Sequence, residues 1–384
     1  MKIAILYPDD FSIWQFRKGL IEGLIKNNHE VYIICPRGPF IDRLNNIGCK
    51  HIHIDFGRFL SPVDDIKYIF RLYRIFRKHK FDIVHNFTIK PNLYGAISAK
   101  LAKVPLILGT VEGMGAIYTE NSKTLYKLLR PIVSMFYRLS CKISDRYWFL
   151  NIDDLSFFVE KKLIAKEKAI LVKSTGLNTE EYSEDMVDSN KMEQLKIDIN
   201  YKKGDKLVVM IVARFLWSKG IREFLEASKI VTKEKSNIRF ILVGTFEEGS
   251  PDIVPKKYIT DQQSDNFTLL EFRNDIVELL SLSELVTLPS FYREGVPRIL
   301  MEAMALKRPI ITTDNVGCRE LVEEGKNGYL VPIKNEKELA KRILDVIIDE
   351  EKSKAFGEYG RQKVVKEFDD KIIVSLLLKE LYRI

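Results

Sequence analysis

Two glutamates in the second half of the chain have the type and spacing of ligands for a hydroxyl-rich, anionic molecule. Glu294 and Glu302 lie eight positions apart in FYREGVPRILMEAMA, residues 291–305. Gly295 permits close backbone approach, and Pro297 suits the first turn of a helix. The N–H groups at that helix start would attract an anion, while the carboxylates would accept hydrogen bonds from hydroxyls. The stretch fits a sugar nucleotide lying across a helix N-terminus, and a loop leading into a surface helix fits it equally well.

Two cations upstream of this stretch could complete the site. A strand expected over Leu207–Ala213 delivers Arg214, and Lys219 follows in RFLWSKG. Such a pair at the carboxyl end of a strand suits a diphosphate, which needs compensation for about two negative charges. A single arginine would be explained as surface charge. Arg273 ends a later strand beside an expected N-cap, where the adjoining backbone could bind the edge of a base.

The sequence offers no motif for metal or cofactor chemistry. No two aspartates are separated by a single residue, so a DxD clamp for a metal-bound nucleotide is absent. The loop at residues 8–17 has no GxGxxG, and neither GxxxxGKS nor GxxxxGKT occurs. We therefore expect no metal ion and no cofactor, with protein cations and helix N-termini balancing the diphosphate.

Three loops of the first half could bind a second substrate. The candidates are Arg17, Lys90, Asn92, Glu112, Gly113 and Gly115. Arg17 falls near the start of the first expected helix and could hold a phosphate, although solvated charge is slightly preferred. Lys90 and Asn92 follow an apolar strand, a position that often carries function. In TVEGMGAI the glycines permit a backbone-lined cavity in which Glu112 could orient a hydroxyl; a turn with an exposed glutamate is equally consistent.

Strands and helices alternate in both halves of the chain. In the first half we expect strands at Lys2–Tyr7, Glu30–Cys35, His51–Asp55, Ile83–Phe87, Pro105–Val111, Tyr147–Leu150 and Ala169–Lys173. In the second half we expect them at Leu207–Ala213, Arg239–Val243, Phe267–Glu271, Leu285–Leu288, Pro309–Thr313 and Gly328–Val331. Later helices are expected at Ile221–Glu234, Asn274–Ser281, Pro297–Ala305, Arg319–Glu324, Glu336–Glu350 and Ser353–Tyr382. This alternation indicates an α/β fold with two parallel sheets, whose ligands bind where the strand order reverses.

Length and composition indicate two globular domains. The chain has 384 residues, 46% of them hydrophobic and 30% charged. Its four cysteines form no CxxC pair, which fits a reducing cytosol and argues against a disulfide scaffold or a zinc site. The start, MKIAILYP, lacks the features of a signal peptide, and no apolar run approaches the roughly 18 residues of a spanning helix. We therefore expect a cytoplasmic location.

Positive charge is concentrated in the first half. Residues 1–150 hold 23 Lys and Arg against 12 Asp and Glu, while the remainder holds 38 against 41. The helical patterns at Asp65–Lys80 and Lys123–Arg146 carry basic stripes beside apolar residues. The stripes comprise Lys67, Arg71, Arg74 and Lys78, then Lys123, Lys127 and Arg130, then Arg138, Lys142 and Arg146. Such helices can lie in an anionic membrane interface at the inner face of the cell membrane, and ordinary helices with a solvated basic face are the alternative.

Taken together, these motifs resemble glycosyltransferase family 4, the retaining transferases of the GT-B fold. The matching pieces are TVEGMG, VARFLWSKG, FRNDIVELL, REGVPRILMEAMA, RPIITTD and GCRELVEEGKNGYLVP. With LVKSTGLN they are most similar to the N-acetylgalactosaminyltransferases that act on undecaprenyl-diphosphate-linked sugars in bacterial glycan assembly. The resemblance implies a UDP-HexNAc donor, a polyprenyl-diphosphate-linked sugar acceptor and transfer with retention, without nucleic acid as a partner.

The resemblance also implies roles for particular residues. The donor contacts would be Arg214, Lys219, Arg273, Glu294, Gly295, Val296 and Glu302. The two leading cations would bind the departing diphosphate, and Glu302 the ribose. Glu294 and the backbone after it would hold the donor sugar, with the uracil near Arg273. Catalysis would rest on Arg214, Lys219, Glu294 and Glu112.

The GT-B fold implies two Rossmann-like domains facing across a cleft. Residues 1–175 would bind the acceptor and face the membrane, residues 176–365 would bind the nucleotide sugar, and about 366–384 would cross back to the first domain. The first loop, PDDFSIWQFRKG, replaces the glycine-rich loop of some members, and TVEGMG lacks a histidine that some carry. The acceptor contacts are therefore the part that the resemblance supports least.

Two other functions remain compatible with these features. A sugar-nucleotide 2-epimerase or a phosphorylase could share the fold. A protein that binds nucleic acid or an anionic lipid surface would explain the basic first half, but it leaves the charged residues of the second half without a role.

Overall fold

The computed structural model describes residues 1–57, 61–119, 124–246 and 250–384. The chain divides into two compact units. Unit 1 comprises Met1–Tyr118, Ser122–Gly176 and Asp370–Ile384, and unit 2 comprises Thr119–Asn121 and Leu177–Asp369. The carboxyl-terminal segment thus belongs to the unit formed by the first half of the chain.

Unit 1 is built on a seven-stranded parallel sheet in the order β3-β2-β1-β4-β5-β6-β7. Its strands are β1 (Lys2–Leu6), β2 (Glu30–Cys35), β3 (Lys50–His53), β4 (Ile83–Phe87), β5 (Leu106–Val111), β6 (Arg146–Phe149) and β7 (Ala169–Leu171). The central strands are buried almost throughout, as expected when helices cover both faces of a sheet. The strand order reverses between β1 and β4.

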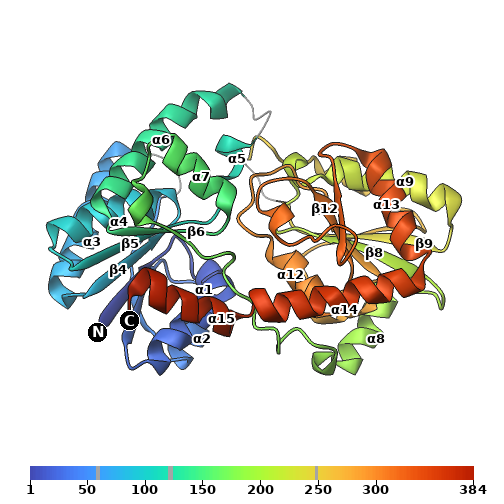
Figure 1. The fold of residues 1–384 in the computed structure, drawn as a ribbon, viewed down its shortest axis with the longest axis horizontal. Coiled ribbons are helices and arrows are strands. Elements are labelled where there is room, and N and C mark those ends of the chain that lie inside the picture. Colours follow the sequence, from blue (N-terminus) through green and yellow to red (C-terminus); the bar gives the residue numbers. More distant parts are fainter. Residues whose placement is uncertain (58–60, 120–123, 247–249) are drawn as a thin grey trace. The chain divides into compact units, whose positions relative to one another are not determined.

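Helices lie on both faces of this sheet (Figure 1). Those of unit 1 are α1 (Asp10–Lys26), α2 (Ile41–Asn46), α3 (Pro62–His79), α4 (Ile89–Leu101), α5 (Gly115–Tyr118), α6 (Thr124–Ile143), α7 (Ile152–Glu160) and α15 (Asp370–Leu376). The Asp9 side chain caps α1 by accepting from the Ser12 N–H at 2.7 Å. Helix α15 packs against α1, and on the opposite face α4 packs against both α3 and α6.

Unit 2 has a six-stranded parallel sheet in the order β10-β9-β8-β11-β12-β13. Its strands are β8 (Lys206–Ile211), β9 (Ile238–Val243), β10 (Phe267–Leu270), β11 (Leu285–Leu288), β12 (Ile310–Thr313) and β13 (Gly328–Val331). Its helices are α8 (Ser189–Asp198), α9 (Ile221–Glu234), α10 (Lys256–Thr260), α11 (Ile276–Leu282), α12 (Arg298–Ala305), α13 (Glu336–Ile347) and α14 (Glu350–Glu367). Here the order reverses between β8 and β11. The predicted α/β class with two parallel sheets is confirmed.

One helix prediction was wrong, and another was confirmed except for a break of two residues. The stretch expected to be helical at Arg319–Glu324 forms only a 3-10 turn at Cys318–Glu320. The Asn327 side chain accepts from the Glu323 N–H and donates to the Leu321 carbonyl, which removes backbone groups that a helix needs. The helix expected over Ser353–Tyr382 is interrupted after Glu367, because Asp369 pairs with Leu177 in an isolated parallel bridge.

The basic helical patterns of the first half are present as α3 and α6. Helix α6 ends at Ile143, so Arg146 lies in β6 instead of continuing the helix. Lys123 lies outside the described residues. Within the part of the chain that the structure describes, no helix is both long enough and apolar enough to cross a membrane.

Candidate active site

The loops that follow β8 and β11 bring two of the predicted donor residues of unit 2, Lys219 and Glu294, into contact. Arg214 and Lys219 lie in the first loop, and Glu294 lies in the second, on either side of the point where the strand order reverses. The two loops can approach each other closely because residue 220 is a glycine with φ of +81°. A Cβ on Gly220 would lie 2.1 Å from the carbonyl oxygen of Pro289.

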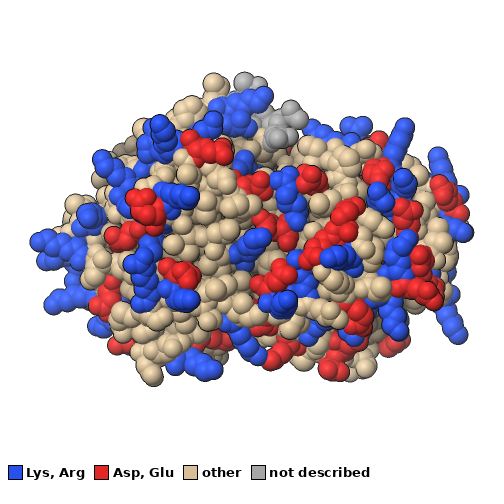
Figure 2. All heavy atoms as spheres, in the orientation of Figure 1, with Lys and Arg blue, Asp and Glu red and all other residues tan. Residues whose placement is uncertain are grey.

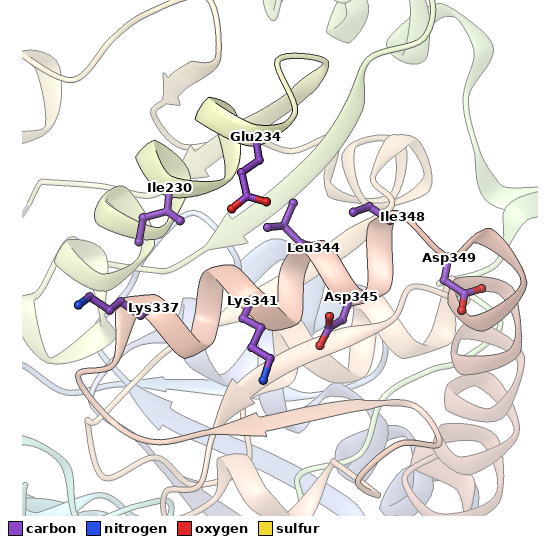
Figure 3. A pocket seen from close by; sticks show the side chains of 8 residues that line it. All are labelled: Ile230, Glu234, Lys337, Lys341, Leu344, Asp345, Ile348 and Asp349. Atoms are coloured by element: carbon purple, nitrogen blue, oxygen red, sulfur yellow. The ribbon is translucent and has the colours of Figure 1, made fainter.

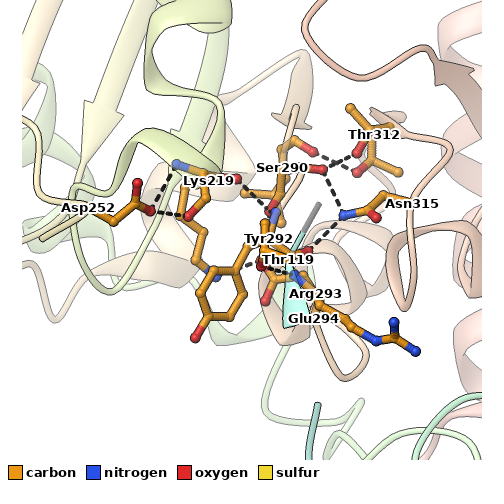
Figure 4. Close-up of polar contacts among 12 residues, drawn as sticks. Thr119, Lys219, Asp252, Ser290, Tyr292, Arg293, Glu294, Thr312 and Asn315 are labelled. Atoms are coloured by element: carbon orange, nitrogen blue, oxygen red, sulfur yellow. Dashed lines mark hydrogen bonds and ion pairs between the residues drawn. The ribbon is translucent and has the colours of Figure 1, made fainter. Parts of the chain in front are cut away.

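Lys219 and Glu294 form an ion pair at the centre of this site (Figure 4). The Lys219 Nζ lies 2.6 Å from Glu294 Oε1, and the two side chains are only 17% and 12% exposed. Glu294 Oε1 also accepts from Ser290 Oγ at 2.9 Å. The Lys219 ammonium lies 4.6 Å from the ring centroid of Tyr292, a cation–π distance. The structure thus joins a cation suited to phosphate with a carboxylate suited to sugar hydroxyls.

Neighbouring loops fix the backbone that carries Glu294. The side-chain amide of Asn315 donates to the carbonyls of Ser290 and Tyr292, at 3.2 and 2.7 Å (Figure 4). The Phe291 and Tyr292 N–H groups both donate to the carbonyl of Ser218, at 2.8 and 2.9 Å. The glutamate is therefore held by hydrogen bonds to the loops after β8 and β12.

Gly295 and Val296 lead from this loop into α12. Residue 317 must also be a glycine here, because its φ is +76° and a Cβ would lie 1.9 Å from the Gly295 carbonyl oxygen. Val296 is buried, and the extended Pro297 precedes the first residue of α12. The expected arrangement of a glycine-containing loop entering a helix is therefore present.

Glu302 lies on α12 with its side chain nearly buried. Its Oε1 accepts from Arg298 Nε at 2.8 Å. Burial by itself would lower the pKa of Arg298, but the Glu302 carboxylate and the Tyr182 side chain together outweigh it and raise that pKa. Burial, followed by the Glu302 charge, raises the pKa of Tyr182. Glu302 therefore belongs to a cluster with a cation and a phenol.

Arg273 is held by two carboxylates of its own unit. Its guanidinium pairs with Asp275 and, at 2.7 Å, with Asp198 at the end of α8. The hydrogen bond to Asp275 is the main cause that raises the pKa of Arg273. These contacts join the loop after β10 to α8, and a uracil contact by this segment stays a prediction.

Sequence reasoning missed several side chains that the structure places in the site. These are Tyr182, Ser290, Tyr292 and Arg298. The backbone carbonyl of Ser218, which accepts from Ser290 Oγ, was missed as well. The spacing of Arg298 and Glu302, four residues apart on one helix, could have predicted their pairing. Tyr182 could not be found in this way, since it lies far from α12 in the sequence.

In unit 1 the strand ends hold a second set of candidates. Arg17 is fully buried and pairs with Glu112, so the preferred interpretation of Arg17 as solvated charge was wrong. Its guanidinium lies 4.4 Å from the Phe87 ring centroid and 5.0 Å from that of Trp148. Tyr7 Oη donates to both carboxylate oxygens of Glu112, at 2.6 and 2.7 Å. Burial, and then the Glu112 charge, raises the pKa of Tyr7 well above its usual value.

Glu112 follows β5, and buried side chains anchor the end of that strand. Asn92 donates to the Thr110 carbonyl at 2.8 Å and accepts from the Thr110 N–H at 3.2 Å. His85 bridges Thr110 Oγ1 and Tyr382 Oη, each at 2.7 Å, and burial lowers the pKa of His85 well below its usual value. Glu112 itself remains 20% exposed and can be reached from outside.

The remaining candidates of unit 1 follow β4 and β5. Lys90 and Asn92, which were expected in a loop, lie in the first turn of α4, and Gly115 is the first residue of α5. Gly113 and Gly115 have positive φ angles of 121° and 62°, which glycine adopts readily. Lys90 Nζ pairs with Asp65 at 2.7 Å and donates to the Gly57 carbonyl at 2.8 Å. The Asn92 side-chain amide forms its hydrogen bonds with the Thr110 backbone in β5. Acceptor contacts by these four residues stay predictions.

Comparison with known proteins identifies the class to which this fold and site belong. A family model described as "Glycosyl transferases group 1" matches residues 192–363, and one described as "Glycosyl transferase 4-like" matches residues 2–145. The solved structure of HepE from Anabaena, in complex with UDP and glucose, superposes with a TM-score of 0.82. That match covers 100% of both chains at 19% identity, and it supports the fold alone.

Relatives of known name place the chain more narrowly. It is 31% identical, over 99% of its length and 98% of the relative's, to the N,N'-diacetylbacillosaminyl-diphospho-undecaprenol alpha-1,3-N-acetylgalactosaminyltransferase of Campylobacter jejuni. It is 27% identical, over 91% and 87%, to the Escherichia coli UDP-Gal:alpha-D-GlcNAc-diphosphoundecaprenol alpha-1,3-galactosyltransferase. The chain belongs to glycosyltransferase family 4 and is a glycosyltransferase of the GT-B fold.

Proposed function

We propose that this enzyme transfers a HexNAc from a UDP-sugar to an undecaprenyl-diphosphate-linked sugar, with retention at the anomeric carbon. The most specific form of the proposal is α-1,3 transfer of GalNAc. The observation that carries the donor half is the Lys219–Glu294 pair at the reversal point of the unit 2 sheet. The names of the Campylobacter and Escherichia coli relatives support the acceptor half.

The donor chemistry follows from the charges at this point. The bond between the anomeric carbon and the β-phosphate oxygen breaks, and its electron pair leaves with UDP. Lys219 and Arg214 stabilise the charge that develops on the diphosphate, while Glu294 holds the sugar hydroxyls. The acceptor hydroxyl attacks the oxocarbenium-like carbon from the same face and gives its proton to the departing phosphate. Protein cations balance the diphosphate, so the proposed site needs no metal ion.

Glu112 is the unit 1 group proposed to orient the acceptor hydroxyl. Its carboxylate is fixed by Arg17 and Tyr7 and is still partly exposed. A carboxylate held in one rotamer can accept a hydrogen bond from an incoming hydroxyl without paying for its own ordering. Arg17 and Tyr7 are therefore positioning residues.

Membrane association is proposed to take place through α3 and α6. Both helices expose large apolar side chains that a globular protein would normally bury. These are Val63, Ile66 and Phe70 on α3, and Leu128, Ile132, Met135 and Leu139 on α6. Basic side chains predominate along the margin of unit 1 where these two helices lie, whereas both signs mix over unit 2 (Figure 2). Apolar residues flanked by cations suit an anionic membrane interface, which is where a polyprenyl-linked acceptor resides.

A panel of UDP-sugars against polyprenyl-diphosphate sugars tests the reaction, with the product linkage assigned by NMR. We expect UDP-GalNAc to be the preferred donor and an α-1,3 linkage to form, at a rate that EDTA leaves largely unchanged. UDP-HexNAc without acceptor should stay chemically unchanged, because a 2-epimerase would convert it. Transfer of a hexose alone would overturn the donor assignment, and strict loss of activity on chelation would overturn the metal-free site.

The Tyr7→Phe variant tests the positioning of Glu112. It removes the hydroxyl hydrogen that the two carboxylate oxygens share, while leaving an aromatic ring of nearly the same shape. We expect kcat to fall about tenfold, which matches the free energy that a hydrogen bond to a charged group contributes. The KM for the donor should not change. Steady-state kinetics and thermal unfolding would be measured together.

Tyr32→Phe is the matched control for this variant. Tyr32 also donates to a glutamate, Glu30 at 3.1 Å, and lies in the same sheet. It should retain full kcat. Equal losses in the two variants, or none in Tyr7→Phe, would show that the phenol of Tyr7 does not serve the reaction.

A further inference from the structure

A basic hollow lies in unit 1 between the end of α6 and the segment after α7. Its volume is about 410 Å³, within the usual range for small-ligand sites. The residues that line it are Arg138, Cys141, Lys142, Val159, Lys162, Leu163, Ile164, Ala165 and Lys168. Four of these are cations, and none of the described lining residues is an aspartate or glutamate. The hollow therefore favours an anion.

The carboxyl end of a helix would normally repel an anion, and here a lysine offsets that effect. Lys168 Nζ donates to the carbonyls of Cys141, Lys142 and Ser144, at 3.2, 3.1 and 2.6 Å. It neutralises the negative end of the α6 dipole. Arg138, Lys142 and Lys162 remain exposed above an apolar floor that includes the buried Leu163 and Ile164.

A groove of unit 2 has a different charge distribution. The groove between α9 and α13 has a volume of about 550 Å³ (Figure 3). Its lining includes Lys337 and Lys341, but also Glu234, Asp345 and Asp349. Because both signs are present, that groove has no preference for an anion.

The basic hollow adjoins the exposed apolar stripe of α6. At 100° per residue, Leu128, Ile132, Met135 and Leu139 fall within about 60° of one another around the helix. Arg138 and Lys142 lie on one flank of that stripe, about 50° to 90° from its centre. A lipid whose acyl chains meet the stripe would therefore present its headgroup beside the hollow.

We infer that this hollow binds the phosphodiester headgroup of an anionic phospholipid. The inference rests on the proposed membrane association and makes it specific, since it assigns a defined headgroup site instead of diffuse charge attraction. Arg138 and Lys142 would contact the phosphate from α6, and Lys162 would contact it from the opposite wall. The apolar floor would receive the glycerol backbone.

The test compares two double variants that remove the same charge. Arg138→Ala with Lys162→Ala empties the hollow of two lining cations. Lys161→Ala with Lys166→Ala removes two exposed lysines of the same region that do not line it. Co-sedimentation is measured with vesicles of phosphatidylcholine alone, and with vesicles that also contain phosphatidylglycerol. We expect the lining pair to lose about tenfold or more of the binding to phosphatidylglycerol vesicles, and the control pair less than about threefold.

A short-chain soluble lipid distinguishes binding at a defined headgroup site from general attraction to a charged surface. Dihexanoyl phosphatidylglycerol, kept below its micelle concentration, should raise the Tm of the unmodified protein but not that of the lining variant. Inorganic phosphate should raise neither. Equal losses in both double variants, no loss in either, or an equal effect of inorganic phosphate would overturn the inference. Neither binding assay contains a sugar nucleotide, so a negative result leaves the proposed transfer reaction intact. Likewise, failure of the transfer assay would leave the proposed headgroup site intact.

Discussion

Lys219→Ala is expected to lower kcat by about 10² to 10³-fold. Lys219 is one of two cations proposed to stabilise the departing diphosphate, and removing one such electrostatic group typically costs this much. UDP should also bind more weakly, because the ammonium would contact the diphosphate in the bound state as well. The measurements are single-turnover transfer rates and UDP titration by calorimetry.

The same variant should lose much less in folding stability than in turnover. Glu294 is left without its cation but keeps the hydrogen bond from Ser290 Oγ. We expect the free energy of unfolding to fall by about 1–2 kcal/mol. Lys229→Ala is the control, since Lys229 forms an exposed pair with Glu226 at 2.9 Å on α9 of the same unit. Near-normal transfer by Lys219→Ala would show that Lys219 does not stabilise the departing diphosphate. Near-normal transfer by Arg214→Ala would show the same for Arg214.

Glu294→Gln is expected to lower kcat/KM by about 10²-fold while leaving UDP affinity nearly unchanged. The amide keeps the size of the side chain but cannot match a carboxylate as an acceptor for sugar hydroxyls, and it loses the charge-assisted bond to Lys219. UDP lacks the sugar, so its affinity should change by less than about threefold if Glu294 contacts only the sugar. Transfer kinetics and UDP titration would be compared directly.

Glu302→Gln provides the contrasting control. Its carboxylate is proposed to hold the ribose, which UDP and UDP-sugar share, so this variant should weaken both ligands alike. If Glu294→Gln also weakened UDP as much as UDP-sugar, the assignment of Glu294 to the donor sugar would fail. The two variants therefore distinguish the glutamates by which ligand each one weakens, and not merely by how much each lowers the rate.

The strands of both sheets could be predicted because parallel strands covered by helices are continuous apolar runs between polar turns. The prediction at Ile83–Phe87 matches β4 at both ends, and the one at Leu285–Leu288 matches β11. Errors fell where local pattern and tertiary contact disagree. At Arg319–Glu324 the Asn327 side chain takes hydrogen bonds that a helix would need, and no pattern in the sequence reports that contact.

The candidate site of unit 2 could be located from the sequence, but its pairings could not. Strand alternation places the loops with Lys219 and Glu294 at carboxyl ends of strands, which is a topological consequence of a parallel sheet. That these two side chains meet at 2.6 Å depends on the close approach at Gly220. The sequence likewise gave no reason to choose Asp198 as a partner for Arg273, since these residues come from separate elements.

The sequence by itself determined the α/β class, the family and the loops proposed to bind the donor, because each depends on local periodicity or short motifs. Only the tertiary structure decided which charges are neutralised. Arg17 and Glu112 lie 95 positions apart, and a buried guanidinium must find a carboxylate wherever the fold supplies one. On α6 the structure instead leaves cations exposed around a hollow whose described lining residues include no carboxylate. The sequence shows how many charged residues there are. Whether each of them can bind a ligand depends on whether folding buries it beside a partner or leaves it in solvent.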